Sequence, residues 1–458
     1  MKFIDNILKY SLIEHFIFAV LAILSVVFFE ERLIADSSYY IFRVINSQSF
    51  WIEHNRYILA FSQFLPLIGV KLGFSLKTIL LLYSIGHPIF FYIIFLIAKY
   101  YYKDQNAGFL IITLQTIGIL SGFFVPMFEL YYASALIVLV STILYKSNSK
   151  YDNIIIVILS FFIITGHPFA NILLLFVMLI HAQQYGLKYF RKYILILTIM
   201  LIVFIFKKLN YSEYEYWKTM EFIHNILHSV YDLSYFKSLI ILLITYYKEL
   251  LLIELLTLVY LISSKEYLKS AIVFSAFIAV LIIINLSYYG AAHGRYQEQV
   301  YFSLSFIVAY PFFIYLFNNK AKSNKSLFVL ILFITTLRLY GIKSEGKSFS
   351  NRVSEIKTNI QIARKNDGTK FIINEHNLKY DPNWSYPIET LLISSYNNNL
   401  SITICTDVDI DFENNKAKIK AKQYLFRRWE IYDIESLNKQ YFMLDKSLYC
   451  EIKPAKIK

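Results

Sequence analysis

The chain has 458 residues, of which 57% are hydrophobic and only 17% are charged, and its mean hydropathy is +0.49. Soluble domains carry roughly 25% charged residues, so this composition excludes an ordinary soluble protein and predicts a polytopic membrane protein. The net charge is +13, but the lysines lie mainly in short loops between apolar segments, as the positive-inside rule describes for cytoplasmic loops. The charge therefore reports membrane topology, and we expect membrane lipids, but no nucleic acid, as partners.

Apolar segments long enough to cross a hydrocarbon core of roughly 30 Å recur along the first three quarters of the chain. Lys2 and Lys9 place the N-terminus in the cytoplasm, and a span at about 13–29 brings the polar segment 30–57 to the outer side. Residues 57–74 suit the membrane interface better than a crossing, although the sequence does not decide between the two. Further spans are predicted at about 76–98, 107–126, 130–146, 154–184 (two short spans broken at Gly166-His167-Pro168), 193–207, 237–262, 270–287, 299–317 and 327–343.

These segments predict an all-α polytopic bundle of about 11 transmembrane helices at residues 1–343. Residues 344–458 have the composition of a soluble domain, with strands predicted near 370–374 and 400–405 and a helix near 388–396. We therefore expect a small α/β domain there, and the number of spans places it outside the cytoplasm. Its two cysteines, Cys405 and Cys450, are a possible pair in an oxidising compartment, but sequence does not establish the geometry.

The first outer loop holds the richest group of polar residues. A carboxylate at the membrane boundary, such as Asp36, can accept a proton from a hydroxyl. The alternative roles for Asp36 are a helix N-cap or a solvated loop residue. Glu30 and Glu31 compete for the same role, but we expect them to pair with Arg32.

Other outer residues suit the binding of an anion. Arg56 has the planar guanidinium that binds phosphate through two hydrogen bonds, and its alternative role is an anchor to lipid headgroups. His293 and Arg295 lie beside Gly290 and Gly294, where backbone amides can approach an anion closely. The sequence places these groups on one side of the membrane.

Three further ionisable residues fall on the same side, and we expect them to take part in donor or substrate binding. His167 lies beside a proline at the outer end of an apolar segment, and its alternative role is structural. Glu129 is a second acid or a boundary residue, and Glu298 closes the loop that begins at residue 288. The aromatic loop at 208–236 suits either sugar faces or an interfacial belt. No Cys/His ligand cluster is present, so we predict no structural zinc and name no metal-binding residue or cofactor, while a requirement for a divalent metal stays open.

The chain resembles the GT-C superfamily of integral-membrane glycosyltransferases in three features. These are the motif Asp36-Ser37-Ser38-Tyr39-Tyr40 in the first outer loop, some eleven spans and a C-terminal extracytoplasmic domain. The resemblance implies a polyprenyl-phosphate-linked sugar donor and transfer on the outer face. It also implies Asp36 as the catalytic base and, by position, Arg56, His293 and Arg295 as ligands of the lipid phosphate. The first loop has no adjacent Asp-Glu pair, and the chain lacks the WWDYG-type motif of oligosaccharyltransferases, which argues against transfer to asparagine.

We therefore expect an inverting glycosyltransferase of the plasma (inner) membrane that acts on a glycan, lipid or protein acceptor. The rival within enzymes is a polysaccharide polymerase or ligase, which would depend on arginines in large outer loops. The rival from another class is a transporter or flippase. That function predicts ionisable residues deep in several spans and an internal repeat, whereas the predicted spans hold few such residues and no repeat is visible.

Overall fold

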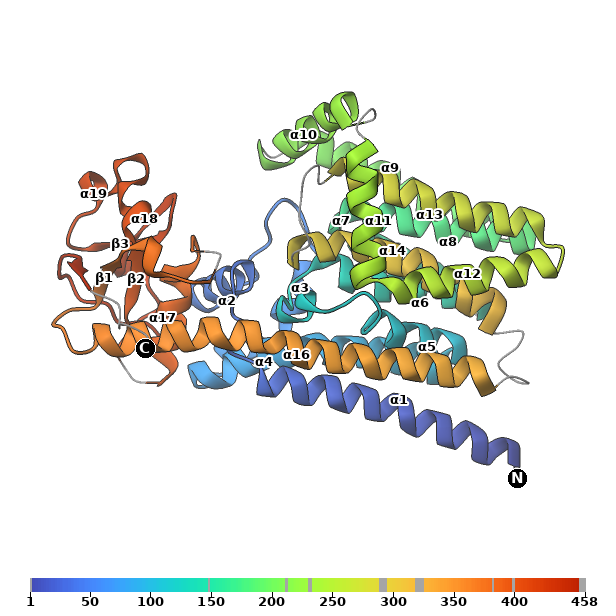
Figure 1. Cartoon of the computed structure of the whole chain (residues 1–458), viewed down its shortest axis with the longest axis horizontal. Helices are drawn as coiled ribbons and strands as arrows, with labels where there is room; N and C mark the ends of the chain where they lie inside the picture. Colours follow the sequence, from blue (N-terminus) through green and yellow to red (C-terminus); the bar gives the residue numbers. More distant parts are fainter. Residues whose placement is uncertain are drawn as a thin grey trace.

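The structure, a computed structural model, describes residues 2–146, 149–210, 213–229, 233–287, 295–317, 325–380, 383–397 and 400–452. It is a largely helical molecule with a small β region near the C-terminus. Figure 1 shows a long helical bundle that has the N-terminus at one end and the α/β domain at the other. The expected all-helical bundle followed by a small α/β domain is confirmed in this form.

Apolar helices build the bundle. Among the described residues, six of these helices are long and apolar enough to cross a membrane: Leu76–Tyr101, Glu129–Lys146, Pro168–Tyr185, Tyr267–Ser287, Glu298–Phe317 and Lys325–Ala363. The pair Phe190–Leu209 and Glu213–Leu227 bends by 105° and is a seventh span if it is counted as one. About 11 spans were expected. The described residues give fewer because the other expected spans are shorter, bent or broken.

The bounds of the bundle helices are α1 (Lys2–Val27), α3 (Leu59–Lys71), α4 (Leu76–Leu96, continued by a π-helical turn to Tyr101), α5 (Gln105–Leu114), α6 (Glu129–Lys146), α7 (Asp152–Gly166), α8 (Pro168–Tyr185), α9 (Phe190–Leu209), α10 (Glu213–Ser229), α11 (Leu233–Tyr246), α12 (Lys248–Ser263), α13 (Tyr267–Ser287), α14 (Arg295–Pro311, continued by a π-helical turn to Phe317) and α16 (Lys325–Ala363). At about 1.5 Å per residue, the 13 residues of α3 span roughly 20 Å, less than a hydrocarbon core. This length favours the interfacial position expected for residues 57–74.

Two of the expected spans are broken, and the prediction of a single helix was wrong in each case. The helix expected at 107–126 ends at Leu114, and the chain then passes through Gly118, which has a φ of +73°, to a 3-10 turn at Ser121–Phe124. The helix expected at 237–262 breaks at Tyr247, where Arg338 of α16 donates to the Tyr246 carbonyl and pairs with Glu249. The aromatic loop expected at 208–236 is also corrected, since it contains α10.

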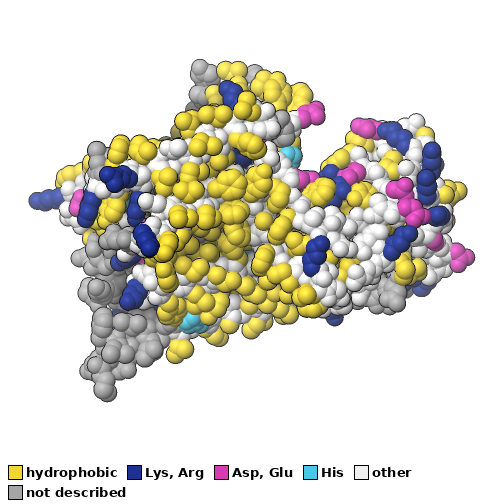
Figure 2. Space-filling view, turned by 180° about the vertical axis from the view of Figure 1, so that it is seen from behind, with side chains coloured by type: hydrophobic (Ala, Val, Ile, Leu, Met, Phe, Trp, Pro, Cys, Tyr) yellow, Lys and Arg dark blue, Asp and Glu magenta, His cyan; other side chains and the backbone are white. Residues whose placement is uncertain are grey.

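The core of the bundle is formed by α6 and α14. In the apolar 18-residue stretch of each helix, the buried share is 89% for α6 and 94% for Glu298–Phe317. The same share is only 28% for α16. Outer helices therefore present apolar side chains to the surroundings. Figure 2 shows these side chains covering the visible face of the bundle, with charged side chains gathered at its left end and over the α/β domain on the right. This distribution is compatible with insertion into a membrane.

The α/β domain begins inside α16, which runs without a break through the expected boundary at 343/344 and ends at Ala363. Its parallel sheet has the order β2-β1-β5, with β1 (Lys370–Ile373), β2 (Thr403–Thr406) and β5 (Cys450–Glu451). The other elements include α17 (Tyr386–Asn397), α18 (Asp407–Asp411) and the antiparallel hairpin of β3 (Gln423–Arg427) and β4 (Glu430–Asp433). The strands near 370 and 403 and the helix near 390 were correctly predicted.

The two cysteines of this domain are free thiols in the structure. Cys405 lies in β2 and Cys450 in β5, on opposite sides of the central strand β1. Two strand spacings amount to roughly 10 Å, which exceeds the Cα separation that a disulfide allows. The structure therefore does not support pairing.

Helix α2 (Asp36–Ser47) lies between the bundle and the α/β domain (Figure 1). Phe42 packs on Phe426 of β3, with ring centroids 4.6 Å apart. Arg43 pairs with Glu430 of β4, and its guanidinium lies 4.7 Å from the centroid of the Trp51 ring. These contacts fasten α2, and with it Asp36, to the α/β domain.

Candidate functional site

Asp36 is the first residue of α2, directly after a backbone outlier. Ala35 has φ 52° and ψ −124°, a conformation that costs a residue with a β-carbon of order 1–3 kcal/mol. Its N–H donates to Glu389 Oε1 at 3.0 Å, and Glu389 in turn pairs with Arg352 at 2.9 Å. Ala35 occupies the N-cap position, and no side chain caps the helix there. Asp36 is therefore not the N-cap residue, and the strain beside it is maintained by a buried ion pair from the α/β domain.

Arg56 and Glu129 form an ion pair, with Nη1 and Oε1 2.8 Å apart. The Glu129 side chain is 3% exposed and that of Arg56 is 17% exposed, so the arginine still reaches solvent. Burial alone would lower the pKa of Arg56, but the carboxylate of Glu129 raises it. His54 stacks on Tyr214 of α10 at 4.5 Å. Burial and the charge of Arg56 lower the pKa of His54 below its usual value.

Two tyrosines connect these groups. The charges of Asp36, Arg56 and Glu129 all act on the hydroxyl of Tyr40, and those of Asp36 and Glu129 also act on Tyr83 of α4. Three of the residues expected at the site therefore lie in one place. The charge of Arg56 also acts on His167, which caps α8 by accepting a hydrogen bond from the Phe169 N–H at 3.3 Å.

Glu53 belongs to the same site, although the sequence did not single it out. It accepts hydrogen bonds from Tyr39 Oη at 2.5 Å, from Trp51 Nε1 at 3.0 Å and from Tyr40 Oη at 3.2 Å. Burial would raise the pKa of Glu53, but these bonds and the charge of Arg427 outweigh it and lower the pKa. The feature of the sequence that could have identified Glu53 is its position in the same predicted outer loop as the paired tyrosines.

Arg32 is the second residue that sequence reasoning missed. It is completely buried, and burial lowers the pKa of its guanidinium to about 9. It donates to Ser25 and lies 4.4 Å from the Phe123 ring centroid, while its Nε and Nη2 have no partner among the described residues. The expected pairing with two glutamates was wrong. Glu30 pairs with Lys357 at 2.6 Å, and Glu31 accepts a hydrogen bond from Ser350 at 2.8 Å.

Glu298 does not fit the substrate-binding role that we expected. It is fully buried and accepts hydrogen bonds from the N–H groups of Leu120 at 2.7 Å, Ser121 at 3.0 Å and Gly122 at 2.8 Å, and from the Ser121 hydroxyl. One loop thus holds both carboxylate oxygens. The role of Glu298 is to complete the break in the expected 107–126 span.

Two expected site residues are not placed. His293 lies outside the described residues, and Arg295 begins α14 but its side chain is outside the part that the structure describes. Within that part, no group of three His, Cys, Asp or Glu residues is arranged to hold a metal ion.

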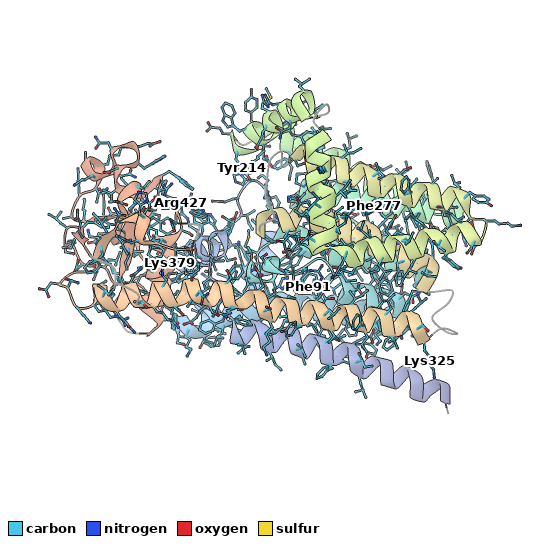
Figure 3. The ribbon with its side chains drawn as sticks, viewed as in Figure 1. Phe91, Tyr214, Phe277, Lys325, Lys379 and Arg427 are labelled. Atoms are coloured by element: carbon cyan, nitrogen blue, oxygen red, sulfur yellow. The ribbon has the colours of Figure 1, made fainter. Side chains whose placement is uncertain are left out.

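A hollow opens beside the group around Asp36. Figure 2 shows it between the projecting part of the molecule near α10 and the α/β domain, with acidic, basic and histidine side chains inside it. Tyr214 and Arg427 lie on its two sides (Figure 3). Tyr214 stacks on His54, and the Arg427 guanidinium lies 4.3 Å from the Tyr39 ring centroid. Residues of the first loop therefore contact a side chain on each side of the hollow.

Comparison of the chain with protein-family models, curated proteins and solved structures finds no match. The resemblance to the GT-C superfamily therefore stays a prediction that rests on the residues quoted for it.

Proposed function

We propose that the protein is an inverting glycosyltransferase that uses a polyprenyl-phosphate-linked sugar and acts on a hydroxyl of a glycan, lipid or protein acceptor. The observation that carries this proposal is that Asp36 and the Arg56–Glu129 ion pair lie close to Tyr40 at one end of an apolar bundle, in the loop that borders the hollow. A lipid-linked donor needs its chain in the membrane and its phosphate at the boundary. This arrangement offers both.

In the proposed reaction the acceptor hydroxyl gives its proton to the Asp36 carboxylate. The acceptor oxygen forms a bond to the anomeric carbon, and the bond from that carbon to the phosphate oxygen breaks. The electron pair leaves with the lipid phosphate. Inversion follows because attack and departure take place on opposite faces of the sugar.

Arg56 would stabilise the departing phosphate. One of its nitrogens is bound to Glu129, and the partly exposed guanidinium keeps further N–H groups for an anion. Glu129 fixes the orientation of Arg56, which makes it a positioning residue. Such preorganised charges act most strongly where charge develops in the transition state.

The proposal places this end of the bundle on the extracytoplasmic face of the plasma membrane. Loops rich in lysine, such as those at 99–103, 146–150 and 265–269, alternate along the sequence with the segments that carry the site. The positive-inside rule assigns such loops to the cytoplasm.

The test is sugar transfer from a panel of polyprenyl-phosphate sugars by purified protein, with wild type beside Asp36→Asn. We expect transfer by wild type and a loss of roughly a hundredfold or more in the variant, the range expected for a lost general base. Asp411→Asn is the matched control, because Asp411 is exposed in the α/β domain, and it should transfer as wild type does. Full activity of a folded Asp36→Asn protein would exclude Asp36 as the base, and absence of donor consumption by wild type would reject the transferase.

A transporter or flippase is the second candidate because two acids lie inside the bundle. Glu254 of α12 is 5% exposed, and neither of its carboxylate oxygens has a hydrogen-bond partner among the described residues. Glu14 of α1 pairs with Lys99, and both are buried. Intramembrane acids mark transport pathways by default. Lipid-linked sugar flipping in proteoliposomes that is abolished by Glu254→Gln, but not by Asp36→Asn, would favour this function.

A further inference from the structure

Two tryptophans stack on each other at the surface of the α/β domain. Trp384 precedes α17 and Trp429 lies in the turn between β3 and β4, and their ring centroids are 5.5 Å apart with planes inclined by 30°. Trp429 remains 52% exposed. The inner indole supports the outer one, so the pair presents a firm aromatic surface to the outside.

This pair adjoins the hollow beside Asp36. The Arg427 guanidinium lies 5.2 Å from the Trp429 ring centroid and 4.3 Å from that of Tyr39. Arg427 extends toward the gap between the α/β domain and the bundle (Figure 3). One arginine therefore links the tryptophan pair to α2.

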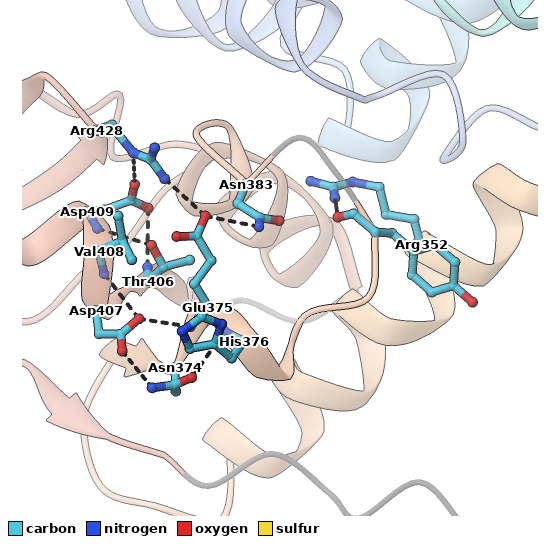
Figure 4. A network of polar contacts seen from close by, with 11 residues as sticks. Arg352, Asn374, Glu375, His376, Asn383, Thr406, Asp407, Val408, Asp409 and Arg428 are labelled. Carbon is cyan, nitrogen blue, oxygen red and sulfur yellow. Dashed lines mark hydrogen bonds and ion pairs between the residues drawn. The ribbon is translucent and has the colours of Figure 1, made fainter. Parts of the chain in front are cut away.

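On the other side, the neighbours of both tryptophans belong to one polar network (Figure 4). Arg428 pairs with Glu375 at 3.1 Å, and Asn383 donates to the same carboxylate at 3.1 Å. The side chains of Arg428 and Glu375 are each about a quarter exposed, at 26% and 25%. Both therefore remain open to a ligand.

Asn383 supplies an independent sign of a missing partner. It is more than nine-tenths buried, and its Oδ1 accepts no hydrogen bond among the described residues. A buried amide oxygen without a donor has lost its hydrogen bonds to water and gained none in the fold, which is unfavourable. A hydroxyl group of a ligand would satisfy it.

The network also lies where ligands commonly bind in α/β domains. Glu375 follows β1, and Asp409, which pairs with Arg428 at 2.6 Å, follows β2. Both acids are therefore at the carboxyl ends of parallel strands, the edge at which open α/β sheets bind ligands.

The chemistry of the surface selects a sugar. A pyranose ring has an apolar face that can lie on an indole and a rim of hydroxyl groups that can bond to carboxylate, guanidinium and amide. The positive charges of Arg427 and Arg428 are balanced by Glu375, Asp409 and Glu430, so the surface does not select an anion. Ionised groups on both sides of the pair also disfavour a membrane, which would desolvate them.

We propose that Trp384 and Trp429, with Glu375, Arg428 and Asn383, form a binding site for an uncharged glycan whose pyranose ring stacks on Trp429. Under the proposed function this glycan is the acceptor or the growing product. If the protein is the proposed transferase, this site identifies its acceptor as a neutral glycan. Glycan binding can be tested without measuring sugar transfer.

The test is equilibrium binding of a panel of neutral oligosaccharides to the full-length protein in nanodiscs, measured by calorimetry. We expect Trp429→Ala to weaken binding at least tenfold and Trp429→Phe to weaken it less. Trp217→Ala should leave binding unchanged, because Trp217 is an exposed tryptophan that lies on α10, outside the α/β domain. Glu375→Gln tests the polar side and should weaken binding without altering the stack.

Three results would overturn the site: no binding of any oligosaccharide, equal binding by wild type and Trp429→Ala, or quenching of Trp429 fluorescence by brominated lipid, which would make the pair a membrane anchor. The outcomes also separate the two proposals. Glycan binding without any transfer by wild type would keep this site and reject the transferase. If Trp429→Ala transfers sugar as well as wild type does, and no oligosaccharide binds at the tryptophan pair, the transferase is kept and the glycan site is rejected.

Discussion

Asp36 and Glu298 are both carboxylates in the first turn of a helix, yet their surroundings differ. Glu298 is fully buried, and four donors of one loop bind it. Asp36 is partly exposed and directly follows a strained residue. A carboxylate whose acceptor sites are all used stabilises the backbone that supplies the donors. A carboxylate that stays accessible beside stored strain is placed to exchange a proton.

The largest effect should follow from removing the structural carboxylate. Glu298→Ala leaves the N–H groups of residues 120–122 buried without an acceptor, and we expect a loss of roughly 3–5 kcal/mol, as for the removal of one partner from a buried charged network. Thermal unfolding in detergent measures it. Glu413→Ala, at an exposed glutamate, is the control and should unfold as wild type does. Equal stability of the Glu298→Ala protein would show that the loop does not depend on this carboxylate.

A smaller effect should come from the loop that binds Glu298. A β-carbon at Gly122 would lie 2.0 Å from Tyr131 Oη and 2.7 Å from Glu298 Oε1, so Gly122→Ala should destabilise the fold by about 1–3 kcal/mol through overpacking. Gly86→Ala is the matched control, because its nearest neighbour is Leu65 at an ordinary 3.7 Å. If both variants melt at the same temperature, the close packing at Gly122 is not required.

On the Asp36 side, relieving strain should separate stability from activity. Ala35→Gly removes a strain of about 1–3 kcal/mol at an entropic cost of roughly 0.5–1 kcal/mol, so the fold should become slightly more stable. Transfer should slow by several-fold, since Asp36 is then held less firmly. A stability below that of wild type would mean that the backbone at residue 35 is not strained.

The smallest effect concerns pH. The pKa of Glu53 is lowered in the folded protein, because the hydrogen bonds from Tyr39 and Trp51 outweigh the effect of burial. Its contribution to stability is therefore complete above the unfolded value of about 4.5 and is lost as the pH falls through the lowered value. Glu53→Gln should reduce the stability difference between pH 6 and pH 3. An unchanged difference would contradict the lowered pKa.

The sequence by itself determined the elements whose signals are local. Hydropathy located the apolar helices, and short runs of β-branched and aromatic residues near 370 and 403 located two strands. The loop that carries Asp36 and Arg56 was also visible, because polar residues between two apolar segments stand out within a short window. Hydropathy and periodicity report the environment of each segment, so these features required no knowledge of distant contacts.

Only the tertiary structure decided which groups are paired. Glu389 binds the N–H of Ala35 across 354 residues, and Glu298 accepts from a loop that lies 176–178 residues away. The inward orientation of Arg32 depends in the same way on packing against Phe123. A buried charge is stabilised by whichever donors or acceptors the packed helices bring to it. Those partners lie far apart in the sequence, so no local pattern contains them.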